Sequence, residues 1–434
     1  MGKRLNTVED KTEDLREKLY RAAERSPDRR FHALYDRIYR RDILERAWNE
    51  VRANHGAAGV DGITIEAIEA RGVEPFLDAL QQQLQDGTYR PLPVRRVSIP
   101  KQNGEQRHLG IPAVRDRVVQ AATKLVLEPI FEADFLDCSY GFRPGRSAHQ
   151  ALDASRTEVI RGRMWVVDAD IADCFDSIGR QVITKALRER ISDRRVLRLI
   201  EGWLKAGVRA GVVLLNPRTG TPQGGVLSPL LANVVLHSLD RQWQHHWRLG
   251  VLVRYADDLV ILCPTKERAE TALAVLEAIL AQVGLKLAQA KTRLVDLREH
   301  GEGFDFLGFH HRRIKSRRTG RYFCARWPSK RALQAARAAI NARTERRRLL
   351  LPVEAVVEDL NRFLIGWRNY YRFGNSSEAF SKLDWHSHHR LALFISKKHG
   401  CGPTFAWRLM AKHAYFGLER LTGNVWTGSV HAFR

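Results

Sequence analysis

The sequence predicts an α/β protein (α+β) that continues into an all-helical C-terminal region. Short runs rich in β-branched residues, at 164–171 and 251–263, are typical of strands. Longer helical patterns lie before, between and after these runs. Beyond Ser329 every pattern that we can interpret is helical. We therefore expect a mixed body, a boundary near 312–328 and a helical domain after it.

Each element is predicted from a local pattern, in chain order. Residues 10–50 have a polar helical character, and a helix over 76–87 is expected to end at Gly87. The segment 94–112 contains two extended stretches around Asn103-Gly104, a dipeptide typical of tight hairpin turns. The elements expected next are a helix over 114–135, a strand over 164–171, a helix within 180–206, a turn over 216–225, a helix over 228–247 and a hairpin of strands 251–255 and 259–263.

The composition indicates an ordered protein with a polyanionic partner. The 434 residues, 44% of them hydrophobic, suffice for two to four globular domains. The net charge of +23 calls for nucleic acid or a membrane surface as partner, and nucleic acid is the first candidate. The N-terminus has no signal-peptide pattern, and no window approaches about 18 uninterrupted apolar residues. We expect a soluble, intracellular protein that has no contact with a membrane.

The five cysteines are predicted to be reduced thiols. They lie far apart and form no C-x-x-C pair, which argues against a zinc site and against a disulfide framework. They are Cys138, Cys174, Cys263, Cys324 and Cys401.

The positive charge is concentrated in residues 312–348. This segment has 14 Lys or Arg and one acid, Glu345, and so carries +13 of the net +23. A basic run is often only a solvated surface. Here Tyr322, Phe323 and Trp327 stand among the charges, a mixture suited to phosphate contact and base stacking. We interpret the segment as binding nucleic acid.

Acids in two of the predicted strand regions indicate a metal site. Asp257 and Asp258 lie at the tip of the hairpin 251–263, and Asp168 and Asp170 share one face of a strand because strand side chains alternate. Asp is common in turns for local reasons, which is the alternative explanation for the hairpin pair. Acids buried together are costly unless a cation neutralises them. Two Mg²⁺ ions about 4 Å apart, held by such oxygen ligands, support in-line phosphoryl transfer.

Eight short motifs stand in order between residues 58 and 310. They are 58-AGVDGIT-64, 99-IPKQNGEQRHLGIPAVRDRVVQ-120, 139-SYGFRPGRSAHQAL-152, 170-DIADCFDSI-178, 221-TPQGGVLSPLLANVVL-236, 254-RYADDLVIL-262, 284-GLKLAQAKT-292 and 306-FLGF-309. In this order they resemble the reverse transcriptases, and most closely the maturase type encoded by bacterial group II introns. A weaker resemblance to the maturase or thumb motif continues in 361-NRFLIGWRNYYRF-373. The resemblance implies the right-hand polymerase fold, with fingers, palm and a helical thumb.

The resemblance gives the metal-binding role to Asp170, Asp257 and Asp258, as the carboxylates that hold two Mg²⁺ ions. Asp168 competes with Asp170 for this role. We prefer Asp170 because it begins the Asp-Ile-x-x-x-Phe pattern. Lys291 matches a lysine of the family that protonates pyrophosphate, although one lysine in a basic protein is a weak signal.

The resemblance also places residues around the incoming nucleotide. Lys101 and Arg107 would grip its triphosphate, and Gln223 would approach it from a glycine-rich turn, where the backbone can come close. Phe175 would be a steric gate that leaves no room for a 2′-hydroxyl, so deoxynucleotides are the expected substrate. The alternative for Phe175 is an ordinary place in the core.

Further residues are expected to contact primer and RNA. Leu307 and Gly308 match the primer grip of the family. The residues expected on RNA are Arg312, Arg313, Arg317, Arg318, Arg368 and Arg372, with Arg362 and Asn369 as neighbours. A helical stripe is expected to form the core of the thumb; its members are Val357, Leu360, Leu364, Trp367 and Tyr371.

The expected domains follow the motifs. Residues 1–90 would be a helical extension and the start of the fingers, and 91–311 the fingers and palm. Residues 312–328 would be a basic linker, and 329–400 the helical thumb or maturase domain. Residues 401–434 have no clear role, and no metal-nuclease pattern for a C-terminal endonuclease is visible after residue 373.

The expected function is RNA-directed DNA polymerase, with a second role as a maturase that binds its parent intron RNA. The expected partners are intron RNA, an RNA template, a DNA primer and its product, and dNTPs, in the bacterial cytoplasm near the nucleoid. One alternative is an RNA-binding chaperone without polymerase activity. Another is a relative recruited for antiviral defence or CRISPR spacer acquisition.

Overall fold

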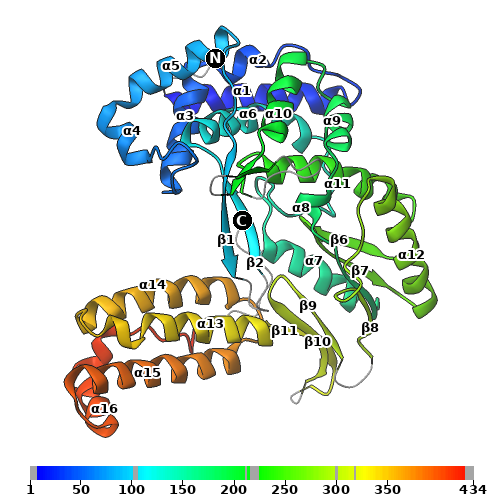
Figure 1. Ribbon diagram of the computed structural model, residues 1–434. Coiled ribbons are helices and arrows are strands. Elements are labelled where there is room, and N and C mark those ends of the chain that lie inside the picture. Colours follow the sequence, from blue (N-terminus) through cyan, green and yellow to red (C-terminus); the bar gives the residue numbers. More distant parts are fainter. Residues whose placement is uncertain are drawn as a thin grey trace, which may run out of the picture.

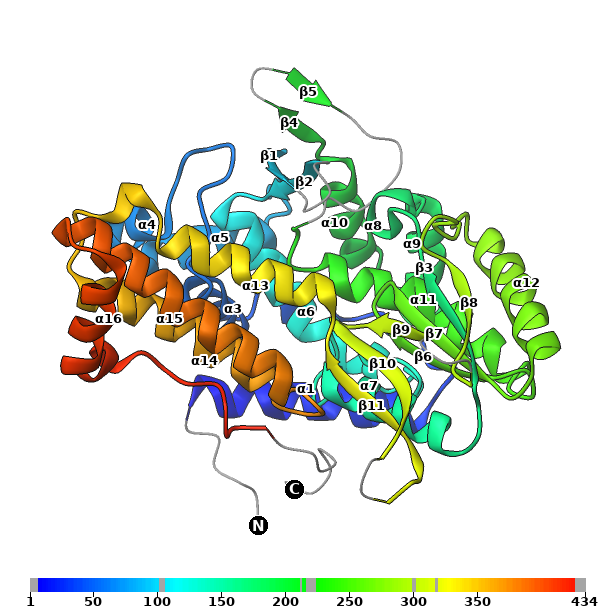
Figure 2. The ribbon, with the colours of Figure 1, turned by 90° about the horizontal axis from the view of Figure 1, so that it is seen from below.

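The computed structural model describes residues 7–100, 106–210, 213–215, 224–298, 302–316 and 319–425. These parts of the chain form a body of helices and small sheets, with a separate group of C-terminal helices beside it (Figure 1). A view turned by 90° shows three of the C-terminal helices, in yellow to orange, running alongside one another, with the red helix across their end (Figure 2). The predicted succession of a mixed body and a helical domain is confirmed.

The N-terminal helices pack around one long helix, α6 (Val114–Glu132), which is buried along nearly its whole length. Helix α1 (Val8–Arg25) packs on α6 and begins at a capping box, in which Thr7 and Asp10 each accept a hydrogen bond from the other's backbone N–H. Gly87, at φ 68°, follows the fifth helix as predicted. The other helices here are α2 (Tyr35–Ile38), α3 (Arg41–Ala53), α4 (Ile65–Arg71) and α5 (Val73–Gln85).

The first sheet has the strand order β2-β1-β4-β5. Its long hairpin pairs β1 (Val94–Pro100) with β2 (Gln106–Ile111), in a register that puts Ile99 opposite Arg107. The two extended stretches predicted within 94–112 are thereby confirmed, and the turn Asn103-Gly104 lies outside the described residues. The short strands β4 (Val208–Ala210) and β5 (Val213–Leu215) complete the sheet.

The central sheet has the order β6-β7-β3-β8 and is antiparallel throughout. Its strands are β3 (Trp165–Asp170), β6 (Val251–Tyr255), β7 (Asp258–Cys263) and β8 (Arg293–Asp296), which confirms the strand predicted over 164–171 and the predicted hairpin. Apolar residues of β3 and β7 are buried on both faces of the sheet, because helices cover one face and a further sheet lies against the other. This burial makes the sheet a rigid support for whatever its ends carry.

The described residues of the body include six further helices. The sequence predicts a helix within 180–206, and the structure has two there, α9 (Arg180–Arg188) and α10 (Arg194–Lys205). The chain stops and restarts at Asp193, whose carboxylate accepts hydrogen bonds from the first N–H groups of α10 and from the backbone of Leu34 and Tyr35. The other four are α7 (Ala148–Ile160), α8 (Cys174–Ser177), α11 (Ser228–Gln244) and α12 (Lys266–Gln282).

The third sheet corrects the prediction of a linker over 312–328. Strand β10 (Phe309–Lys315) pairs with β11 (Tyr322–Pro328) over its full length and with β9 (Gly303–Phe306) on its other side. Apolar side chains of β10 and β11 are buried against α7 and the central sheet, whereas Arg312 and Arg313 of β10 are half-buried. The charged residues hid this alternation in the sequence, because polar side chains on one face interrupt the apolar signal of a strand.

The C-terminal helices have a core of their own. Val357, Leu360 and Leu364, from the predicted stripe, are buried in it, and Trp367 and Tyr371 pack against it. The helices are α13 (Lys330–Arg343), α14 (Val353–Tyr371), α15 (Ser377–His399) and α16 (Pro403–Lys412), with short 3₁₀ turns η1 (Arg346–Arg348) and η2 (Ala414–Gly417). In the described ranges, no helix combines the length and the apolar character that a membrane crossing needs.

Candidate active site

The three predicted metal-binding acids lie together at one end of the central sheet. Asp170 is the last residue of β3 and stands directly opposite Asp258, the first residue of β7. Asp257 precedes Asp258 in the turn between β6 and β7, which we call the acid turn (Tyr255–Asp258). Ala256 enables this tight reversal with a positive φ of 57°. Opposed residues of an antiparallel pair hold their Cβ atoms about 5 Å apart, so the register itself brings acids from two distant segments together.

The acids repel one another in the absence of a cation. Shielding from bulk water by the surrounding protein raises the pKa of Asp258 to about 7, and the charges of Asp257 and Asp170 add to this shift. Asp258 is exposed to water on one side, which weakens the effect of burial on its pKa. The charges of the neighbouring carboxylates are therefore the more important cause of the raised pKa. Lys291 opposes the shift, and its Nζ forms an ion pair with Oδ2 of Asp170.

Asp168 faces a different partner. Its Oδ2 accepts a hydrogen bond from Nε of Arg293, on the neighbouring strand β8, at 3.1 Å. Burial nevertheless raises the pKa of Asp168 to about 6, because the attraction of Arg293 offsets only part of the lost hydration. Asp168 therefore has a counter-charge within the protein, and it lies two residue pairs farther along the sheet than Asp170.

The donor set of the site suits a hard divalent cation. Three carboxylates of Asp170, Asp257 and Asp258 supply oxygen ligands of the kind that such ions prefer. As the described side chains stand, no three acidic, histidine or cysteine groups are close enough to enclose an ion, and Lys291 occupies one oxygen of Asp170. The raised pKa of Asp258 shows that negative charge here is under-compensated, which a bound cation would relieve.

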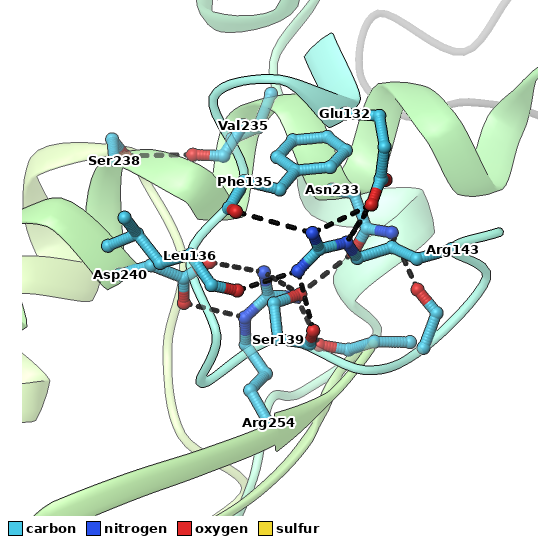
Figure 3. Close-up of polar contacts among 12 residues, drawn as sticks. Glu132, Phe135, Leu136, Ser139, Arg143, Asn233, Val235, Ser238, Asp240 and Arg254 are labelled. Atoms are coloured by element: carbon cyan, nitrogen blue, oxygen red, sulfur yellow. Dashed lines mark hydrogen bonds and ion pairs between the residues drawn. The ribbon is translucent and has the colours of Figure 1, made fainter. Parts of the chain in front are cut away.

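A buried arginine, Arg254, is hydrogen-bonded to the acid turn, and Figure 3 shows it among its partners Asp240, Asn233 and Ser139. Arg254, fully buried, donates from Nη1 to the backbone oxygen of Ala256 at 3.0 Å, and from Nε to Asp240 at 2.8 Å. It also donates to Asn233 Oδ1 and to the hydroxyl of Ser139. Burial by itself would lower the pKa of Arg254, but the charge of Asp240 outweighs it and raises that pKa, so the guanidinium stays charged. Sequence reasoning missed Arg254; the available signal was a charge inside an apolar strand.

The motif 139–152 lies against the same turn. Its first residues run beside β6, with Tyr140 N–H donating to the oxygen of Arg254 at 2.8 Å. A Cβ atom at Gly141 would lie 2.4 Å from the backbone nitrogen of Ala256, so only glycine permits this approach. The glycine of this motif is therefore required by the acid turn, although 115 residues separate the two in the chain.

The residues expected around the nucleotide are only partly described. Lys101 and Gln223 lie outside the described residues, as does the side chain of Arg107, whose backbone is in β2. The glycine-rich turn does approach β2, because a Cβ at Gly224 would meet the oxygen of Gly110 at 2.6 Å. Phe175 lies in α8, half-buried, and packs against the large core of the body. This position suits both the gate and the core interpretation of Phe175.

The expected primer grip is a strained turn in contact with the C-terminal helices. Leu307 and Gly308 connect β9 to β10, with φ of 49° and 78°. Tyr370, near the end of α14, donates its hydroxyl hydrogen to the oxygen of Leu307 at 2.8 Å. A Cβ at Gly308 would lie 2.6 Å from the hydroxyl of Tyr371. The C-terminal helices are thus joined directly to the turn of the expected primer grip.

The arginines expected on RNA differ in their surroundings. Arg313 lies over the ring of Tyr322 at 4.1 Å, on the third sheet, and Arg312 is half-buried beside it. Arg368 forms an ion pair with Glu419, and Arg372 lies beside Phe373. Arg317 and Arg318 are outside the described residues. Arg313 is the arginine whose aromatic neighbour matches the charge-and-stacking pattern seen in the sequence.

Two family models match the chain. Residues 99–311 match the family described as reverse transcriptase (RNA-dependent DNA polymerase). Residues 333–415 match the group II intron, maturase-specific domain. The boundary between the two matches falls on the third sheet and the start of α13, where the body ends and the C-terminal helices begin.

Curated relatives agree with these matches. Protein YkfC of Escherichia coli K12 is 35% identical over 347 residues, which cover 70% of this chain and 88% of that protein. The group II intron-encoded protein LtrA of Lactococcus lactis subsp. cremoris is 39% identical over 226 residues, which cover 52% of this chain but 37% of LtrA. Among solved structures, a partial Cas6-RT-Cas1–Cas2 complex is 28% identical over 58% of this chain and 41% of that one; its TM-score of 0.36 is too low to bear on the argument. By its domains and its relatives, the chain belongs to the group II intron-encoded reverse transcriptases with a maturase domain, a family of RNA-directed DNA polymerases.

Proposed function

We propose that this protein extends a DNA primer on an RNA template with deoxynucleotides, using two Mg²⁺ ions held by Asp170, Asp257 and Asp258. The observation that carries the proposal is the register of the central sheet, which sets Asp170 opposite Asp258 beside the acid turn. The family generally uses divalent metals, and Mg²⁺ is the hard cation that this oxygen donor set and a triphosphate substrate favour. The chain spans little more than a third of LtrA, so activities of that longer protein are proposals for this one.

The residues of the chain would share the work as follows. When bound, the ions would lower the pKa of the primer 3′-hydroxyl and neutralise charge on the phosphates. Lys291 keeps its proton at neutral pH, because its hydrogen bond with Asp170 raises its pKa. It could then donate that proton to the leaving pyrophosphate once Asp170 turns to a cation. Phe175, Lys101, Arg107 and Gln223 are proposed to select and orient the nucleotide.

Primer extension on an RNA template tests this proposal. Wild-type protein is expected to extend the primer with dNTPs in Mg²⁺, and EDTA to stop it. The variant Asp257→Asn is expected to lose extension while its affinity for RNA changes little, because phosphate contacts elsewhere dominate binding. Extension with ribonucleotides in place of dNTPs tests whether Phe175 acts as a steric gate against the 2′-hydroxyl. Near-normal extension by Asp257→Asn would contradict the assignment of the acids.

We infer a second activity, binding of the parent intron RNA to assist its splicing. The match of residues 333–415 to the maturase-specific domain supports it, as does the basic surface that joins that domain to the body. Such a protein would work in the bacterial cytoplasm, near nucleoid DNA. Splicing of the intron that flanks the gene, assayed at low Mg²⁺ with and without protein, tests this activity. Equal affinity for that intron and for an unrelated structured RNA would contradict it and leave only the polymerase.

A further inference from the structure

Phe142 has a conformation and an exposure that folding does not explain. Its φ of 56° lies in the left-handed region, which is unfavourable for a residue that has a side chain. Its aromatic side chain is also 53% exposed, so the residue contributes little apolar burial in return. Residues kept in such conformations cluster at sites that bind or react.

The segment on both sides of Phe142 is held firmly (Figure 3). Before it, the oxygen of Gly141 accepts a hydrogen bond from Nδ2 of Asn233 at 2.7 Å. After it, Arg143 is 7% exposed and donates to the backbone oxygens of Leu136 and Ser139 at 2.6 and 2.7 Å. Arg143 also forms an ion pair with Glu132 at 2.8 Å. With both neighbours fixed by buried hydrogen bonds, the backbone has no freedom to turn the Phe142 ring inward.

The ring stands beside the acid turn. Its centroid lies 6.2 Å from the ring of Tyr255, the residue paired with Asp258 across the turn. The preceding residue, Gly141, touches the backbone of Ala256. An apolar surface is therefore presented next to the carboxylates, where a nucleic-acid end must come for any reaction there.

The packing around Phe142 distinguishes the primer from the incoming nucleotide. Tyr255 packs against the same apolar cluster as Leu307, in the expected primer grip. Phe175, the expected neighbour of the incoming nucleotide, packs against the other cluster, that of the body. Phe142 thus belongs to the side of the acids on which Leu307 lies.

We propose that the Phe142 ring contacts the terminal nucleotide of the primer strand and holds its 3′ end at the acids. This inference rests on the proposed polymerase function. The ring supplies an apolar face for the sugar or base of that nucleotide, a contact that accepts any sequence. The strained backbone at Phe142 and the buried hydrogen bonds of Asn233 and Arg143 then hold the ring in a fixed position against the primer end.

Three substitutions at this position test the contact. Phe142→Ala and Phe142→Gly are expected to raise the dissociation constant for a recessed primer on an RNA template by about tenfold, the scale of one lost stacking contact. Phe142→Tyr, which keeps the ring, should stay close to wild type. Phe142→Gly should melt at the same or a higher temperature than wild type, because glycine adopts a positive φ without strain. Binding is measured without dNTPs, and KM for dNTP is measured separately.

A matched control is Trp247→Ala, which removes another exposed aromatic, 62% exposed, after the end of α11; it should leave primer affinity unchanged. Unchanged primer affinity in Phe142→Ala would overturn the proposal. A raised KM for dNTP with normal primer affinity would also overturn it, because the ring would then contact the incoming nucleotide instead of the primer. A lower melting temperature in both the Ala and the Gly variants would show that Phe142 stabilises the fold, which would also contradict the proposal. Absence of extension by wild-type protein would instead contradict the polymerase function, and the binding measurement would still decide the contact.

Discussion

Arg254 shows how a single buried charge can define a catalytic turn. Its guanidinium joins Asp240 and Asn233 of α11, and Ser139 from a distant part of the chain, to the backbone oxygen of Ala256. A buried ion pair adds little stability compared with apolar side chains of the same size, but it demands one geometry. The carbonyl that precedes Asp257 is therefore set by a network that has no contact with solvent.

Removal of Arg254 should destabilise the whole body. Arg254→Ala is expected to lower the free energy of unfolding by about 3–5 kcal/mol, because it leaves Asp240 buried without its partner. Denaturant titration measures this loss. The control is the double variant Arg254→Met with Asp240→Leu, which removes both charges and should recover much of the stability but not the activity. A loss below about 1 kcal/mol in the single variant would mean that water reaches Asp240.

Asp258 should make stability depend on pH. Its pKa is about 7 in the folded, metal-free protein and near the ordinary 3.8 when unfolded, so the folded state binds the proton more tightly. Stability from this group is then fully present below pH about 4 and is lost as the pH rises to about 7. Asp258→Asn should raise the melting temperature in EDTA at pH 8 and have little effect at pH 4. An equal shift at both pH values would assign the effect to packing.

At the scale of elements, the hairpin of β10 and β11 turns a basic segment into a surface. Pairing of the two strands places Arg313 over Tyr322, which combines a cation with an aromatic face. The same sheet carries the turn at Leu307 and Gly308, which contacts α14. A bound RNA on this hairpin would therefore touch the element that joins the body to the C-terminal helices.

The charge of this hairpin should appear in the salt dependence of RNA binding. Replacing Arg312 and Arg313 with Gln is expected to flatten the slope of log affinity against log salt by about 1.4–1.8 units if both contact phosphates. The control replaces Lys185 and Arg188, two exposed residues of α9 at the far end of the molecule, and should leave the slope unchanged (Figure 1). Equal slopes in all three proteins would show that the hairpin does not bind RNA.

At the scale of the molecule, the C-terminal helices are a second folding unit, joined to the body by hydrogen bonds and by the rings of Tyr370 and Tyr371, which pack against Phe309 of β10. Their core is separate from that of the body. The junction includes the hydrogen bond from the N–H of Asn375 to the oxygen of Arg326 in β11, at 2.7 Å. On the side of the body, Arg326 is itself held by a nearly buried ion pair with Asp153 of α7, at 2.7 Å. Such a junction can hold a position without merging two cores.

Two unfolding transitions are therefore expected in calorimetry. Leu360→Ala, in the core of the C-terminal helices, should destabilise one of them by about 2–5 kcal/mol. Leu231→Ala, in the core of the body, should destabilise the other transition. A single transition that responds to both substitutions would show that the junction couples the two units into one.

The sequence alone was enough for most elements and for the acids. The strands 251–255 and 259–263, the hairpin within 94–112 and the stripe of α14 follow from short-range patterns, which local backbone preferences and burial translate directly into structure. Asp257 and Asp258 stand between two such strands, and Asp170 is preferred over Asp168 because it begins the Asp-Ile-x-x-x-Phe pattern of the family; the metal-binding role of the three stays a prediction. One helix predicted within 180–206 became two, since Asp193 also caps a distant backbone at Leu34 and Tyr35, which no local window contains.

Only the tertiary structure decided how the acids are supported and what stands beside them. Arg254 and Ser139 are 115 residues apart in the chain, and the approach of Gly141 to Ala256 spans a similar distance. The pairing of β10 with β11, and the strained exposure of Phe142, likewise depend on neighbours that the fold supplies. A residue's sequence pattern reports its preference for water or burial along its own segment. The partner of a buried charge is chosen by how segments pack, and that choice exists only in three dimensions.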